Sequence, residues 1–182
     1  MNNRHRYDSS YFNEETIIGR GADGIVYSLG DNKVIKFYRQ YRYVKKETSI
    51  NKILSETNIY VPKIEEIIEM RFLKGHILYN KGNRQWGMIM EKLDGKSLFE
   101  LNNEEESLAN TPYSTKLDEI LDLNLYPQDT GRDHNTLYLA DGDNMAFFDF
   151  VKWKTARISK EMKREILDSD YCPYRKSQDG LR

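Results

Sequence analysis

The chain has 182 residues, of which 28 are basic and 29 acidic, and its net charge is −1. This balance gives no general electrostatic case for nucleic acid or an anionic membrane as a partner. The apolar runs are too short to span a bilayer, and the N-terminal residues lack the apolar core of a signal peptide. Cys172 is the only cysteine, which excludes an internal disulfide. We therefore expect a single monomeric domain that works in the cytosol.

The first half of the chain predicts a small antiparallel sheet with one helix. Residues 1–14 are polar and are expected to form a flexible arm. The segments that follow are rich in β-branched and aromatic residues and are separated by glycine-bearing turns, which is typical of strands. We expect strands over residues 15–18, 25–29, 33–38, 64–73, 76–80 and 86–93, and a helix over residues 43–57.

The second half of the chain has a different pattern. Residues 94–112 predict a short helix followed by an acidic loop, and residues 113–123 predict a second helix. Two short apolar segments, 136–139 and 145–148, flank a turn sequence, which predicts a hairpin. Residues 159–167 have the apolar spacing of a last amphipathic helix.

Three glycines near the N-terminus suggest a phosphate-binding turn. Gly19, Gly21 and Gly24 precede Val26 in the pattern G-x-G-x-x-G-x-V. Glycine allows backbone N–H groups to approach phosphate oxygens, because no Cβ stands in the way. Strands are predicted on both sides of this pattern, which excludes the dinucleotide-binding version with its following helix. Two interpretations of this pattern remain: a hairpin that covers a bound nucleotide, and an ordinary hairpin turn.

A lysine and a glutamate form the next candidate pair. Lys36 lies mid-strand, and strand alternation places it on one face with Val34 and Tyr38. A lysine in this position needs an anionic partner or solvent, so it either holds nucleotide phosphates or protects an edge strand. Glu47 in the following helix offers a carboxylate for an ion pair with it. Glu56 is an alternative, although it lies off that helix face.

The order of these segments resembles the protein kinase-like superfamily. The segments GRGADGIVY, VIK, a helix with Glu47, MIMEKLDGKSL, an Asp-Asn segment and FFDF follow one another within residues 15–152. They match the Gly-rich loop, the strand-three lysine, the helix-C glutamate, the hinge, the catalytic loop and the metal-binding aspartate. The resemblance implies a two-lobed α+β fold in one minimal kinase domain over residues 1–182. Its N-lobe, residues 15–92, would hold a five-stranded antiparallel sheet and helix C, and its C-lobe, residues 93–182, would be much reduced.

The resemblance also implies ATP and magnesium as cofactors. Lys36, held by Glu47, would position the phosphates, and Met90 would lie at the back of the adenine pocket. The backbone of Glu91 and Leu93 would bind adenine. The nucleotide-binding residues implied in this way are Gly19, Gly21, Gly24, Val26, Lys36, Met90, Glu91 and Leu93.

The segment NTLYLADGDNMAFFDF resembles the metal-binding part of phosphotransferase-type kinases, which implies that Asn135 and Asp149 hold magnesium. The catalytic aspartate departs from the family pattern. Asp129 precedes Asn135 by six residues, one more than in the family. Thr130 stands at the family spacing and cannot act as a base. We assign the base to Asp129, with Asp133 as the alternative.

The implied activity is transfer of phosphate from ATP to a serine or threonine of a protein. The small C-lobe resembles the minimal kinase effectors that bacteria deliver into the host cytosol. This likeness implies a host protein as substrate, or one that completes or activates the site. Two alternatives stay open: a small-molecule kinase of the antibiotic-modifying type, and a pseudokinase that only binds a partner, which the altered segment before Asp129 favours.

Overall fold

The computed structural model describes residues 8–80, 84–97, 100–101, 103–127, 135–139 and 145–168. The chain divides into two compact units. Unit 1 comprises Met1–Ser49 and Pro62–Lys92, and unit 2 comprises Ile50–Val61 and Leu93–Arg182. Each unit has its own cluster of buried apolar side chains.

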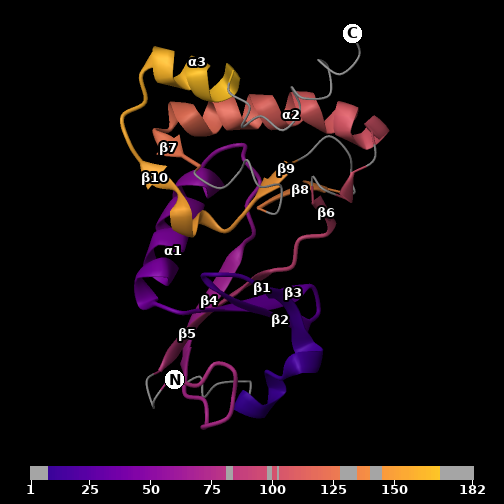
Figure 1. The fold of residues 1–182 in the computed structure, drawn as a ribbon, viewed down its shortest axis with the longest axis vertical. Coiled ribbons are helices and arrows are strands. Elements are labelled where there is room, and N and C mark those ends of the chain that lie inside the picture. The colour runs from indigo at the N-terminus through magenta and orange to yellow at the C-terminus, as the bar shows by residue number, and fades with distance from the viewer. Residues whose placement is uncertain are drawn as a thin grey trace. The chain divides into compact units, whose positions relative to one another are not determined.

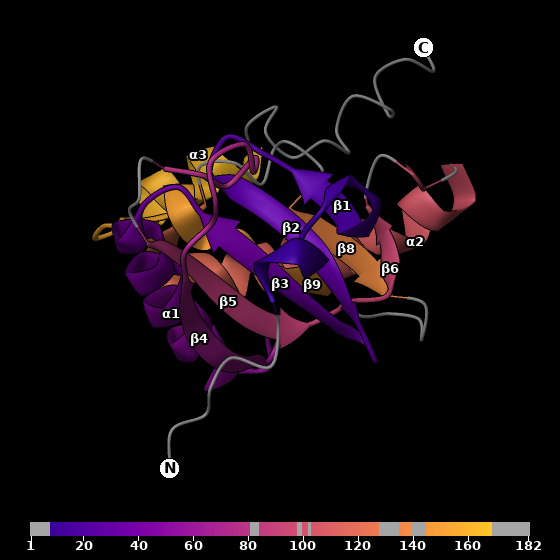
Figure 2. The ribbon, with the colours of Figure 1, turned by 90° about the horizontal axis from the view of Figure 1, so that it is seen from below.

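Unit 1 is built on a five-stranded sheet in the order β1-β2-β3-β5-β4, in which every neighbouring pair is antiparallel (Figure 2). Its strands are β1 (Ile17–Arg20), β2 (Gly24–Gly30), β3 (Lys33–Tyr38), β4 (Ile64–Met70) and β5 (Gln85–Glu91). Helix α1 (Tyr41–Ser55) follows β3, and its residues from Ile50 onward belong to unit 2. The predicted α+β class with a five-stranded antiparallel sheet is therefore confirmed.

The two faces of this sheet have different roles. Ile35 and Phe37 point into the apolar core of unit 1, and strand alternation sends Lys36 to the opposite face. On that opposite face, Met88 pairs with Lys36 in register and accepts a hydrogen bond from the Thr48 hydroxyl of α1 at 3.8 Å. Helix α1 thus covers the lysine face of the sheet.

Two predictions for unit 1 are wrong. Residues 8–14 are not a loose arm, because Phe12 is fully buried and its ring lies 5.0 Å from that of Phe37. Short 3₁₀ helices, η1 (Ser9–Tyr11) and η2 (Glu14–Thr16), lead into β1. Residues 76–80 are not a strand but a series of turns after Gly75, which has φ of 100°. Both edges of β5 are already paired, with β3 and β4, so β5 offers no edge for another strand.

Unit 2 combines helices with short strands (Figure 1). Its elements are β6 (Gly95–Ser97), α2 (Asn103–Asp122), β7 (Leu125–Tyr126), β8 (Thr136–Leu139), β9 (Met145–Phe147), the 3₁₀ helix η4 (Phe150–Lys152), β10 (Lys154–Thr155) and α3 (Lys160–Asp168). Strands β6, β8 and β9 form one antiparallel sheet, and β7 pairs with β10. The predicted hairpin of β8 and β9 is confirmed.

The segment before α2 differs from its prediction. Residues 95–97 form strand β6 rather than a helix, and Gly95 permits this pairing because a Cβ there would lie 2.5 Å from the Tyr138 carbonyl oxygen. Helix α2 begins ten residues earlier than expected, at Asn103, and continues through Pro112. Ala109, Tyr113 and residues further along α2 bury one apolar side of this helix, which outweighs the backbone hydrogen bond that proline removes.

Candidate functional site

The glycine-rich segment forms the hairpin turn between β1 and β2. Gly19 lies opposite Val26, and the turn closes where the Gly21 N–H donates to the Gly24 carbonyl at 3.0 Å. Val26 in turn lies opposite Lys36, so the end of this hairpin and the lysine share one face of the sheet. The structure therefore brings the glycine motif and Lys36 into one neighbourhood.

The glycines of this turn are there for different reasons. A Cβ on Gly24 would lie 2.3 Å from the Phe37 carbonyl oxygen, so the close approach of β2 and β3 requires glycine there. A Cβ on Gly21 would meet nothing within 4 Å, and Gly21 has no positive φ. Neither packing nor backbone conformation requires glycine at position 21. Close approach of a ligand to the backbone is a remaining reason for a glycine there.

Lys36 and Glu47 form a buried ion pair. The Lys36 Nζ lies 3.6 Å from the Glu47 Oε2, and the side chains are 9% and 3% exposed. The expected pairing of Lys36 with Glu47 is confirmed. Tyr38, which sequence analysis did not count as a site residue, places its ring centroid 4.9 Å from the same Nζ. Strand alternation was the signal for it, because Tyr38 shares the face of Lys36.

The predicted hinge follows β5. Met90 is buried and lies opposite Val34 of β3. The Glu91 N–H donates to the Lys63 carbonyl at 3.0 Å, and the Lys92 N–H donates to the Asn32 carbonyl at 2.8 Å. These bonds hold the backbone on either side of the Glu91 carbonyl, which is the group expected to accept a hydrogen bond from adenine.

Unit 2 brings Asn135 and Asp149 to the same end of the β8–β9 hairpin. Thr136 pairs with Phe147, and the Phe148 N–H donates to the Asn135 carbonyl at 3.1 Å. Asn135 therefore lies across from the residue that precedes Asp149. Asn135 and Asp149 are both partly exposed residues.

The backbone of Asp149 is in an uncommon conformation. Its φ and ψ are both 59°, the left-handed region, and its side chain does not cap the 3₁₀ helix η4 that follows. Phe147 and Phe150, on either side, are fully buried in the core of unit 2. A non-glycine residue in this region persists where its surroundings hold it, often at functional sites. The two buried rings hold Asp149 in place.

The remaining site predictions are not all placed by the structure. Asp129 and its alternative Asp133 lie outside the described residues. Lys36 and Glu47 belong to unit 1, whereas Asn135 and Asp149 belong to unit 2. Among the described residues there is no group of three or more histidine, cysteine or acidic side chains that could hold a metal ion. Within the same ranges, no helix is long and apolar enough to cross a membrane.

No protein-family model matches the chain, and no curated protein matches it significantly. The candidate site therefore rests on the geometry of its own residues.

Proposed function

We propose that this protein is a kinase-like phosphotransferase that uses ATP and magnesium to phosphorylate a serine or threonine of another protein. Unit 1 would be the N-lobe of such an enzyme and unit 2 a reduced C-lobe. The observation that carries this proposal is the buried ion pair of Lys36 and Glu47, on the sheet face that also carries the end of the glycine hairpin. A buried lysine held by a carboxylate beside a glycine turn suits the binding of nucleotide phosphates.

The glycine turn and the hinge would hold the nucleotide between them. In the described residues, the N–H of Gly21 is used within the turn, which leaves the following N–H groups of Ala22 and Asp23 for phosphate oxygens. The Glu91 carbonyl and the Leu93 N–H would bind the adenine edge. Lys36 would contact the phosphates and keep its orientation through Glu47.

Asn135 and Asp149 fit a magnesium ion that is bound mainly by phosphate. Magnesium prefers oxygen ligands and usually keeps several waters, with one or two carboxylates from the protein. An amide oxygen and a carboxylate at one end of a hairpin meet that requirement without a larger cluster. When bound, the ion would neutralise charge on the phosphates during transfer.

The transfer itself needs one more carboxylate. The substrate hydroxyl attacks the terminal phosphorus of ATP, the bond to ADP breaks, and the hydroxyl proton passes to a base. We assign this base to Asp129, with Asp133 as the alternative. Because the transition state is loose, the base mainly orients the hydroxyl, which tolerates the one-residue change in spacing.

Transfer of labelled terminal phosphate from ATP to proteins of a eukaryotic cell lysate tests this proposal. The purified chain should label discrete protein bands, and Asp149→Asn should abolish them. Asparagine also tolerates the left-handed backbone of position 149, so this variant should remain folded. The matched control is Asp94→Asn, at an exposed aspartate of unit 2, which should label as the wild type does.

Further variants assign the base and separate the alternatives. Loss of labelling in Asp129→Ala with retention in Asp133→Ala supports Asp129, and the opposite result moves the base to Asp133. Label that enters only small molecules would favour the antibiotic-type kinase. No transfer to either acceptor, in lysate or with added small-molecule alcohols, would contradict a phosphotransferase and favour a binding module.

A further inference from the structure

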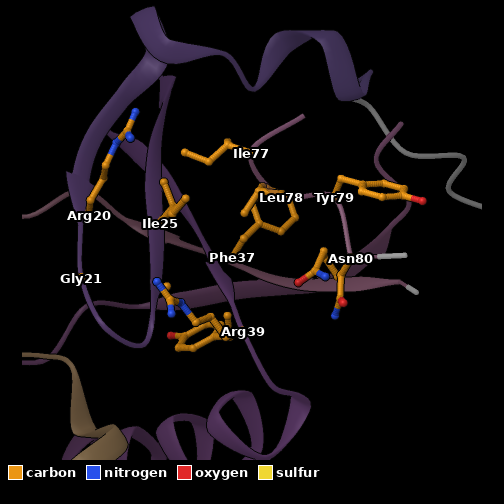
Figure 3. Close-up of a pocket in the computed structure, with 12 residues that line it drawn as sticks. Arg20, Gly21, Ile25, Phe37, Arg39, Ile77, Leu78, Tyr79 and Asn80 are labelled. Atoms are coloured by element: carbon orange, nitrogen blue, oxygen red, sulfur yellow. The ribbon is translucent and has the colours of Figure 1, made fainter. Parts of the chain in front are cut away.

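Unit 1 contains a cavity of about 420 Å³ whose lining includes Gly21 and Gly24 of the glycine turn (Figure 3). Ile25 and Phe37 contribute to its wall, and they lie opposite each other on β2 and β3. Phe37 points away from the face of Lys36, so this cavity lies on the other side of the sheet. The pocket is complete within unit 1 and does not depend on phosphotransfer.

The far wall of the cavity is the segment 77–80, which specific contacts hold in place. The Leu78 N–H donates to His76 Nδ1 at 3.0 Å, and the His76 Nε2–H donates to the Phe12 carbonyl. The His76 ring also stacks on Phe72 at 4.4 Å, and Phe72 is buried in the core. These contacts make the pocket a preformed feature of the fold rather than a gap under a loose loop.

The lining is apolar with a cationic rim. Figure 3 shows Ile25, Phe37 and Leu78 grouped in its middle, with Arg20 and Arg39 at its border. Among the twelve described residues that line the pocket, two are arginines and none is acidic. Arg20 also forms an exposed ion pair with Glu14, outside the lining. For Arg39, the described residues provide no acidic partner.

Two further observations point to a ligand. Gln85 lines the pocket with 6% of its surface exposed. Its amide can donate to or accept from a bound molecule. Ile77 and Tyr79, in the far wall, are 45% and 38% exposed although both are large and apolar. A bound molecule would cover these two side chains and contact Gln85.

We propose that this pocket binds a small organic anion that carries a carboxylate or phosphate on an apolar body. The guanidinium groups of Arg20 and Arg39 suit planar or tetrahedral oxyanions, and the wall of Ile25, Phe37 and Leu78 suits an aromatic or branched aliphatic group. The volume lies within the range of about 300–1,000 Å³ that is typical of small-molecule sites. The apolar wall of this site, with Phe37, lies on the sheet face opposite Lys36, and Gly21 and Gly24 of the glycine turn border it.

A set of four probes tests the chemistry of this site. Phenyl phosphate combines the charge and the apolar body, phenol lacks the charge, inorganic phosphate lacks the body, and benzylamine reverses the charge. Titration of the isotope-labelled full chain, followed by backbone NMR signals, gives the dissociation constant of each probe. We expect phenyl phosphate to bind at least about tenfold more tightly than the other three and to shift the signals of Ile77, Leu78 and Gln85.

Variants of residues that line the pocket test whether the probe binds there. Arg39→Gln should weaken phenyl phosphate binding about tenfold, and Ile77→Glu should weaken it further by repelling the anion. The matched controls are Arg42→Gln, at an exposed residue of α1, and Leu73→Glu, at a 79% exposed residue of the same loop, and both should bind as the wild type does. Saturating ATP with magnesium should also leave the affinity unchanged, because Lys36 belongs to the other face of the sheet.

Three results would overturn the proposal. Equal affinity for phenol and phenyl phosphate would remove the role of the arginines. Wild-type affinity in Arg39→Gln and Ile77→Glu would place the probe elsewhere. Displacement of the probe by ATP with magnesium would show that the probe occupies the proposed nucleotide site. If phosphotransfer fails while phenyl phosphate still binds in the predicted way, the pocket stands and only the proposed function falls.

Discussion

The Lys36 ammonium lies 3.6 Å from the Glu47 carboxylate, and both side chains are almost wholly buried. Removing two charges from water is costly, and the attraction between them often no more than balances that cost. A pair of this kind contributes little to stability compared with apolar residues of the same size. We interpret it as a device that orients Lys36 for a ligand.

We predict that breaking this pair destabilises the protein more than replacing it. Glu47→Gln leaves a buried ammonium beside a neutral amide, and we expect the free energy of unfolding to fall by about 3 kcal/mol. The double variant Lys36→Met with Glu47→Leu should recover most of that loss, because neither charge remains. Urea unfolding of the wild type, both single variants and the double variant measures these values. If the loss of unfolding free energy in the double variant equalled the sum of the losses in the two single variants, this account would be contradicted.

The two glycines of the turn should respond differently to alanine. Gly24→Ala forces a Cβ against the Phe37 carbonyl oxygen, and we expect a loss of about 1–3 kcal/mol in unfolding free energy. Gly21→Ala meets nothing within 4 Å, so its stability should change by less than about 0.5 kcal/mol. The same Gly21→Ala variant should bind ATP more weakly if phosphate oxygens approach this turn closely, because the added methyl group would hinder that approach. Unchanged ATP affinity would mean that Gly21 has no part in binding.

The backbone strain at Asp149 leads to a third prediction. Glycine accepts a φ of 59° without cost, so Asp149→Gly should stabilise the fold by about 1 kcal/mol. The same change removes a proposed magnesium ligand, and phosphate transfer should be lost. Thermal unfolding and transfer assays on the same sample measure both effects. A less stable variant would show that the carboxylate serves the fold, and an active variant would remove Asp149 from the metal site.

The contact between α2 and α3 gives a prediction about pH. Burial works to lower the pKa of Lys163, but hydrogen bonds to Asp122 and Asp118 outweigh it and raise the pKa above its ordinary value. Lys163 Nζ lies 2.5 Å from Asp122 and 2.9 Å from Asp118, as expected from α3 lying beside α2 in Figure 1. Because the pKa is raised in the folded state, the contribution is complete below the ordinary value of about 10.4 and is lost as pH rises through the folded value.

Lys163→Met should therefore lower the unfolding free energy by up to about 1 kcal/mol at neutral pH, which is the size expected for exposed pairs. The difference from the wild type should stay constant up to about pH 9 and shrink above about pH 10.4. Lys160→Met, at an exposed lysine of the same helix, is the control and should show no such change. A difference that instead shrank between about pH 7 and pH 9 would contradict the assignment to Lys163.

The sequence pattern was sufficient to predict the structure where the local preference of a segment agrees with its packing in the fold. The alternation that placed Lys36 opposite the core, and the helical spacing that placed Glu47 toward the sheet, both reflect a periodicity that the chain carries locally. The turn between β8 and β9 also carried its own signal. These patterns predicted an antiparallel sheet and the ion pair, whereas the number of five strands came from the resemblance to kinases.

The predictions that were wrong depend on contacts between distant residues. Nothing local shows that Phe12 inserts beside Phe37, or that His76 ties its loop to the Phe12 carbonyl. Helix α2 passes through Pro112 because its buried side chains outweigh a local helix breaker. The pocket lined by Arg20 and Arg39 has the same origin, since its walls come from separate segments of unit 1.

The most direct test of the central claim is the affinity of the protein for ATP, measured by isothermal titration calorimetry with and without magnesium. We expect wild-type protein to bind ATP in the presence of magnesium, and Lys36→Met to bind at least about tenfold more weakly. Lys45→Met, an exposed lysine of α1, should bind as the wild type does. Absence of ATP binding by the wild type, or equal binding by Lys36→Met, would contradict a nucleotide site at Lys36.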